Sequence, residues 1–288
     1  MDMPQSLTPI REGIVALPPR EAGAVLVARF REHELLRDAG AIAFRLFLSI
    51  VPLTLFGIAM LGFLNLEDVW RQDVAPDFHR EVSSAAFNLI DDTVNKVLTQ
   101  KQGFWLTLGA VIAVWEVSGA VRMAMKSLNA IYGTEERRTL GRELLVSVAL
   151  AGAIIVLVLG AVLTVKLGPL AIEALFGDSA VAAVVGFVVR WASAVVLLAL
   201  AVGLVVRAGP DKARPIGWVT FGTTLVIVGW VGMSLLFGLY LTELADYGSI
   251  FSSLATVFVA LEYVFLSSVI FLGGLVLDAA ARQRSRRG

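Results

Sequence analysis

The sequence predicts an all-α protein: a polytopic bundle of six transmembrane helices, with an extracytoplasmic amphipathic helix between spans 1 and 2 and an N-terminal interfacial helix. Three observations predict this fold class. Of the 288 residues, 57% are hydrophobic, and the mean hydropathy is +0.80, which is more apolar than a soluble domain of this length. Six apolar runs are each close to the roughly 20 residues that cross a bilayer. Basic residues gather in alternate connections between these runs.

Residues 1–38 are predicted to form a cytoplasmic tail that ends in the interfacial helix. Apolar and charged side chains are interleaved over residues 21–37, as in a helix that lies at a membrane surface. The first span, residues 39–64, is apolar except for Arg45. An arginine inside a membrane costs at least about 2.5 kcal/mol, so we expect the bundle to supply a counter-charge. Pro52 in the same span is interpreted as a helix kink that neighbouring helices accommodate.

The remaining elements follow from apolar periodicity and run length. Residues 78–98 carry apolar side chains at intervals of three and four, which predicts the amphipathic helix. The membrane domain, residues 39–281, is completed by spans at residues 103–121, 143–167, 181–206, 216–241 and 249–278. The span at 216–241 contains five glycines and is expected to pack closely, because small residues let helices approach in lipid. Residues 282–288 form a basic tail that is predicted to be cytoplasmic.

The distribution of basic residues predicts the orientation of the bundle. The N-terminal segment, the second loop, the fourth loop and the tail together hold 17 lysines and arginines. The first loop holds four, and the third and fifth loops hold none. Basic residues favour the cytoplasmic side of a membrane. The sequence therefore predicts a multi-pass protein with both termini in the cytoplasm.

Four ionisable residues lie inside the predicted spans: Arg45, Glu116, Arg190 and Glu262. At 1.5 Å per residue, Arg45 and Glu116 both lie roughly 9 Å from the cytoplasmic end. Arg190 and Glu262 both lie nearer the middle. We therefore expect two ion pairs, Arg45 with Glu116 and Arg190 with Glu262. Two interpretations remain open: the pairs fix the register of the helices, or they line a polar path for a substrate.

The sequence offers little for catalysis or metal binding. It has no cysteine, and its two histidines, His33 and His79, are predicted on opposite sides of the membrane. No hydrolase, nucleotide-binding or zinc motif occurs in a suitable context. We therefore expect no catalytic residue, no metal and no cofactor. The formal net charge of zero also argues against a nucleic-acid partner.

Several short motifs occur in a fixed order over residues 25–280. They are Ala43-Phe44 with Ser49 and Pro52, Trp115 to Arg122, Asn129 with Tyr132 and Gly133, Tyr247 with Gly248, and Leu272-Gly273-Gly274. Together they resemble the YihY/BrkB family of bacterial inner-membrane proteins. The resemblance implies six helices, residence in the bacterial inner membrane and no settled biochemical activity, although members were once described as a ribonuclease.

Two functions are compatible with these features. One is a transporter-like protein that moves an amphipathic, lipid-like or small anionic substrate by facilitated or gradient-driven movement. The alternative is a non-transporting scaffold or envelope-integrity factor. Membrane lipids are the expected partners of the protein in either case. Ribonuclease activity is not expected, because the predicted cytoplasmic loops offer mainly arginines rather than the carboxylates and histidines that RNA hydrolysis needs.

Overall fold

The computed structural model describes residues 19–65, 68–76, 91–92, 94–98, 102–177, 179–211, 221–243 and 252–285. Every regular element within these residues is a helix. Six of the described helices are long and apolar enough to cross a membrane. The predicted fold class, an all-α bundle with six spans, is confirmed.

Five of the six membrane helices are longer than the apolar runs from which they were predicted, and the fifth span is described only from Phe221 on. The described elements are α2 (Pro19–Glu32), α3 (Leu35–Phe63), the π-helical turn η1 (Val69–Val74), α6 (Gln102–Tyr132), α7 (Leu140–Phe176), α8 (Ala180–Ala208), α9 (Phe221–Glu243) and α10 (Ser252–Ser285). The largest extension at one end is in α6, where the apolar run ends at Val121 but the helix continues to Tyr132. The basic residues of this extension leave its opposite face apolar, and Leu128 and Ile131 remain buried there.

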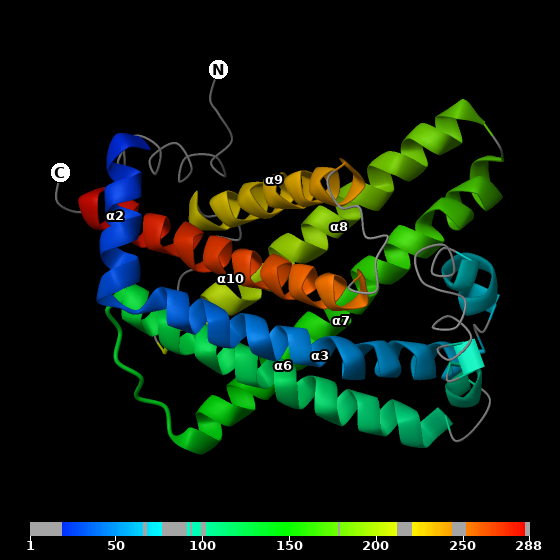
Figure 1. Ribbon diagram of the computed structural model, residues 1–288, viewed down its shortest axis with the longest axis horizontal. Coiled ribbons are helices and arrows are strands. Elements are labelled where there is room, and N and C mark those ends of the chain that lie inside the picture. The colour runs from blue at the N-terminus through cyan, green and yellow to red at the C-terminus, as the bar shows by residue number, and fades with distance from the viewer. Residues whose placement is uncertain are drawn as a thin grey trace.

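Figure 1 shows α3, α6 and α10 running side by side, with α9 along α10 and with α7 and α8 forming an inclined antiparallel hairpin. The end of the bundle that carries α2, residues 133–139, residues 209–211 and the end of α10 is called the basic end below. The main buried cluster joins five helices and includes Leu35, Leu128, Val205, Val226 and Leu272. These five helices therefore pack against one another around this cluster, toward the basic end.

The end of the α7–α8 hairpin that lies away from the basic end has an exposed apolar surface. There α8 exposes Val184, Phe187, Val188 and Trp191, as expected of side chains that face lipid. Its contribution to the main cluster comes from Val202, Val205 and Val206, three to four turns further along the helix. The hairpin is thus anchored at the basic end and has an apolar, uncovered surface beyond it.

Helix α2 runs across the basic end at a steep angle to α3 and α10 (Figure 1). A residue with left-handed backbone geometry, Glu34, separates it from α3. Arg29 donates a hydrogen bond to Gln283, and Glu21 pairs with Arg284, so α2 is fixed to the end of α10. The segment predicted as one interfacial helix, residues 21–37, is therefore divided between α2 and the first residues of α3.

Close packing in the glycine-rich helix α9 is confined to its first half. A Cβ atom on Gly222 would lie 2.9 Å from the Gly274 carbonyl oxygen, and one on Gly229 would lie 2.7 Å from Ile270 Cγ2. Gly232 and Gly238 have no such neighbour within 4 Å. α9 is consequently packed against α10 on one side rather than enclosed by the bundle.

Part of the predicted amphipathic helix, residues 78–98, lies outside the described residues. Its last turn, residues 94–98, is helical, and Val97 is buried there as the periodicity predicts. Trp70 of η1 donates a hydrogen bond from Nε1 to Asp91 Oδ1 over 2.9 Å. Asp91 thus holds η1 against the helical segment that follows.

Candidate functional site

A cavity of about 660 Å³ opens at the basic end against one face of α6. The α6 residues of its wall are mostly three or four positions apart: Gly119, Arg122, Met123, Met125, Lys126, Asn129 and Ala130. Residues with that spacing share a helix face. Arg45 on α3, Thr134 and Glu136 after α6, and Glu143 on α7 complete the wall. Three cationic side chains from two helices therefore border one cavity.

Arg45 and Glu116, the first predicted pair, lie together in the structure. Arg45 Nη1 is 3.6 Å from Glu116 Oε2. Gly119, one turn after Glu116, leaves room for the guanidinium, because a Cβ atom at Gly119 would lie 2.8 Å from Arg45 Cζ. The Arg45 side chain is still 40% exposed. It can therefore pair with an intramembrane carboxylate and face the cavity at once.

Arg190 and Glu262 are not brought together. Glu262 is exposed on α10, while Arg190 Cζ lies 5.8 Å from the centre of the Trp191 ring. Arg190 Nε is buried without a hydrogen-bond partner, and no ion pair among the described residues includes either side chain. Depth along a helix determines neither the rotation of the helix nor its tilt, so equal depth alone does not make two side chains neighbours. The described residues show no ion pair between Arg190 and Glu262, and their pairing stays a prediction.

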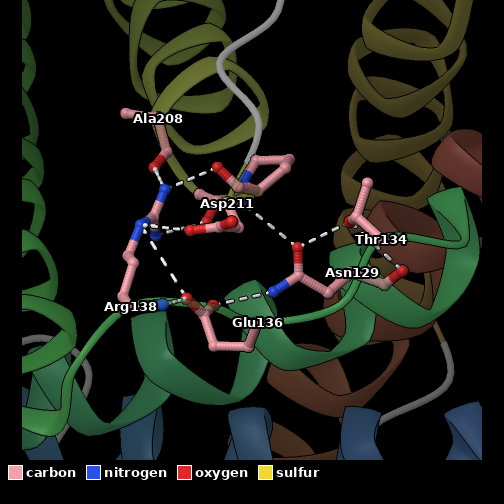
Figure 2. Close-up of polar contacts among 8 residues, drawn as sticks. Asn129, Thr134, Glu136, Arg138, Ala208 and Asp211 are labelled. Carbon is pink, nitrogen blue, oxygen red and sulfur yellow. Dashed lines mark hydrogen bonds and ion pairs between the residues drawn. The ribbon is translucent and has the colours of Figure 1, made fainter.

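Asn129, a residue of the family-like motif, holds three segments together (Figure 2). Its Nδ2 donates to Glu136 Oε2 over 2.8 Å. Its Oδ1 accepts from Thr134 Oγ1 over 2.8 Å and from the Asp211 backbone N–H over 3.1 Å. The buried amide thus joins α6, the loop that follows it and the segment after α8.

Arg138 closes the same cluster from the other side (Figure 2). Its guanidinium nitrogens donate to the carbonyl oxygens of Ala208, Gly209 and Pro210 over 2.5–3.3 Å. Its Nε lies 3.4 Å from Asp211 Oδ1, and the side chain is only 9% exposed. Carbonyls at the end of a helix have no partner within it. Arg138 supplies that partner and fixes the end of α8 to the loop before α7.

The neighbouring motif residues Tyr132 and Gly133 end α6. Gly133 has a φ of +64°, and the Thr134 N–H reaches back to the Asn129 carbonyl over 2.9 Å, which is the hydrogen bond of a Schellman motif. Tyr132 OH donates to Asp278 Oδ2 over 3.4 Å. Asp278 also accepts from the Gly222 N–H and from Arg282. Asp278 is 2% exposed, so it links α6, α9 and α10 inside the protein.

The other motif residues have local roles or lie outside the described part. Ser49 is buried and donates to the Leu46 carbonyl over 2.6 Å, and α3 continues past the buried Pro52 to Phe63. Proline lacks an N–H, so the Leu48 carbonyl loses its helical partner there. Whether Pro52 bends the helix stays a prediction. Tyr247 and Gly248 lie outside the described residues.

Sequence reasoning missed several polar residues that matter at the basic end. Asp38 is 4% exposed and accepts a hydrogen bond from Ser127 Oγ over 2.9 Å, which joins α3 to α6. Arg122, Lys126, Arg138 and Asp278 were read as parts of loops and flanks. For Arg122 and Lys126 the signal was a helical spacing that continues beyond the apolar run in α6. Nothing in the sequence links Asp38 to Ser127.

The cavity holds two carboxylates, Glu136 and Glu143. Glu136 is already bound by Asn129 Nδ2 and by the Arg138 backbone N–H. Within the part of the chain that the structure describes, no three histidine, aspartate or glutamate side chains gather as metal ligands do. Arg45, Arg122 and Lys126 against these two carboxylates give the wall a formal net charge of +1. The arrangement suits an anion.

Comparison with known proteins agrees with the motifs. A family model described as virulence factor BrkB matches residues 26–288. YfkH of Bacillus subtilis (strain 168), which is named as a ribonuclease-like protein, is 24% identical over 265 residues, or 91% of this chain and 95% of the relative. No solved structure matches the chain. Because the family model covers nearly the whole chain, which carries six apolar helices, this multi-pass membrane protein belongs to the BrkB family.

Proposed function

We propose that the protein is transporter-like and moves an amphipathic, lipid-like or small anionic substrate by facilitated or gradient-driven movement. The observation that carries this proposal is the cavity at the basic end, whose wall includes Arg45, the partner of Glu116 inside a span. Ionisable residues in membrane spans are costly, and they commonly mark a substrate path. A charged cavity that reaches such a pair is a suitable entrance for an anion.

The contacts suggest how a substrate would be received. Arg122 and Lys126 lie one helical turn apart and would attract an anion into the cavity. Arg45 lies deeper along the same wall and would exchange part of its contact with Glu116 for the substrate. We further propose that the basic end faces the cytoplasm of the bacterial inner membrane, because basic residues concentrate there.

Reconstitution in liposomes tests the proposal. The purified protein would be offered fluorescent anionic lipids and small anions with an imposed ion gradient or voltage. We expect movement above that of empty liposomes, and about tenfold slower movement for Arg45→Gln, since its loss leaves Glu116 without its counter-charge. Arg142→Gln is the matched control: this arginine is exposed at the same end but does not border the cavity.

Two outcomes of the liposome assay would contradict the proposal. One is that no lipid or anion moves under any gradient. The other is that Arg45→Gln moves substrate as fast as the wild type, which would place the transport path away from this cavity. The first outcome favours the alternative function, a non-transporting scaffold or envelope-integrity protein. The Asn129 and Arg138 contacts are consistent with that alternative, since they fasten three segments of the basic end to one another.

The ribonuclease-like name belongs to the relative, and we propose no nuclease activity for this chain. RNA hydrolysis needs a metal bound by carboxylates or a positioned acid and base. Of the two carboxylates at the cavity, Glu136 is committed to Asn129 and Arg138. A cavity bordered by arginines and a lysine would hold a phosphate without supplying either group.

A further inference from the structure

We infer that the cavity at the basic end binds the phosphate group of its ligand, through Arg122 and Lys126 with Arg45 as a third contact. The inference rests on the proposed function in so far as the bound molecule would be the one that is moved. It goes further by naming the chemical class: a phosphate ester or free phosphate, rather than any anion or amphipathic molecule.

The cations at the cavity differ in the ion pairs and hydrogen bonds that they already make. Arg45 is paired with Glu116. Arg138, just outside the wall, already contacts Asp211 and three backbone carbonyl oxygens. Arg122 and Lys126 take part in no ion pair among the described residues. Arg122 is half-buried and Lys126 is exposed. Two unpaired cations one turn apart on the cavity face thus remain for a ligand.

The geometry of these groups suits phosphate better than a carboxylate. An arginine guanidinium donates two parallel hydrogen bonds to phosphate oxygens, and a lysine adds a point charge. Phosphate has enough oxygens to contact arginines from two helices and a lysine together. A carboxylate has only two oxygens, so it offers fewer acceptor positions to two arginines and a lysine than a phosphate does.

The surroundings indicate an amphipathic ligand. Met123 and Met125 give the wall an apolar part. Beyond it, Trp115 precedes Gly119 by one turn on the same face of α6, and Leu48 follows Arg45 by one turn on α3. Both side chains are exposed, so acyl chains could lie along them while the phosphate remains in the cavity. The same cations would also accept free phosphate, and the experiment separates these two sources.

The test is native mass spectrometry of the full chain in detergent, with phosphatidylglycerol as the probe and inorganic phosphate as the competitor. We expect one retained phosphatidylglycerol on the wild type, bound about fivefold more weakly for each charge removed by Arg122→Gln or Lys126→Gln, at about 1 kcal/mol per cation. Arg142→Gln, the control at the same end, should bind as the wild type does. Displacement by millimolar inorganic phosphate would indicate the free ion as the ligand, and persistence would indicate the lipid.

A second measurement needs no variant. Phosphatidylglycerol should slow the acylation of Lys126 by a water-soluble reagent several-fold, as read from peptide masses. Lys96, which is exposed at the other end of the bundle, should react at an unchanged rate. Equal affinity of all the variants, or equal protection of both lysines, would overturn the inference.

Failure of this inference can be distinguished from failure of the proposed function. If liposomes show movement but Arg122→Gln and Lys126→Gln bind phosphatidylglycerol as the wild type does, the phosphate site is wrong and transport stands. If charge-dependent binding is found but nothing moves, the site stands and transport falls.

Discussion

The amide of Asn129 shows how a single residue orders the basic end. Its three hydrogen bonds reach Glu136, Thr134 and the Asp211 N–H, and the residue is 5% exposed. Leaving such buried partners unsatisfied costs roughly 1–3 kcal/mol each. An aspartate would keep the acceptor but set a negative charge against Glu136. The contacts of Asn129 thus give this motif residue a structural role, whereas Arg122 and Lys126 at the cavity take part in no ion pair among the described residues.

Charge exchange distinguishes the two sets of intramembrane charges. Arg45→Glu and Glu116→Arg should each destabilise the protein by about 1–2 kcal/mol, because each leaves like charges together. The double variant should recover at least half of that loss. For Arg190→Glu with Glu262→Arg, the two losses should simply add, since those residues do not meet. Thermal unfolding in detergent measures both cycles, and recovery in the second cycle would show that Arg190 and Glu262 pair in solution.

How far single residues can be predicted from this sequence depends on what sets their neighbours. Arg45 and Glu116 lie on adjacent, nearly aligned helices, so equal depth was enough to predict their contact. Arg190 lies on a tilted hairpin, where depth does not determine the neighbour. Asp38 and Ser127 are 89 positions apart, and only the folded chain relates them.

At the scale of elements, the contact between α9 and α10 depends on glycine at both helices. The Cβ that alanine would add at Gly274 would lie 3.0 Å from the Gly222 carbonyl oxygen, and one at Gly222 would meet the backbone of Gly274. Backbone atoms cannot move aside as the end of a side chain can. The same crossing lets the Gly222 N–H reach Asp278 over 3.2 Å.

Alanine substitutions along α9 test this crossing. Gly222→Ala should destabilise the protein by about 2 kcal/mol, since the added methyl forces the helices apart. Gly232→Ala on the same helix should be neutral or stabilise by up to about 1 kcal/mol, because nothing lies within 4 Å and alanine favours helix. Apparent melting temperatures in detergent provide the comparison. Equal losses at the two positions would mean that helix propensity, rather than contact with α10, controls the effect.

The ends of helices were predicted well where a helix is apolar throughout. They were predicted less well where an apolar stretch is followed by basic residues in the same helix. The six spans followed from run length, but α6 was ended at Val121 because basic residues begin there. In the structure those residues remain helical, since Ala124, Leu128 and Ile131 continue the buried face. That error of eleven residues hid the cavity, because Lys126 and Asn129 were placed in a loop.

At the scale of the whole molecule, the two ends of the bundle differ in chemistry. The basic end combines the cavity, the Asn129 cluster and the α2–α10 contacts, and both described chain ends lie there (Figure 1). The other end carries η1, residues 94–98 and the turn between α7 and α8. An even number of spans returns the chain to the side on which it began. A single orientation would therefore place every cavity residue on one side of the membrane.

Labelling of single cysteines in intact cells tests this orientation, and the cysteine-free chain gives no background. Lys96→Cys and Ser179→Cys lie at the end away from the cavity, while Arg142→Cys lies beside it, and all three positions are exposed. If the basic end is cytoplasmic, a membrane-impermeant thiol reagent should label the first two in whole cells and the third only after permeabilisation. The reverse pattern would invert the protein and place the cavity outside. Labelling of Lys96→Cys and Ser179→Cys from opposite sides would contradict six spans, because two crossings, α6 and α7, separate these positions.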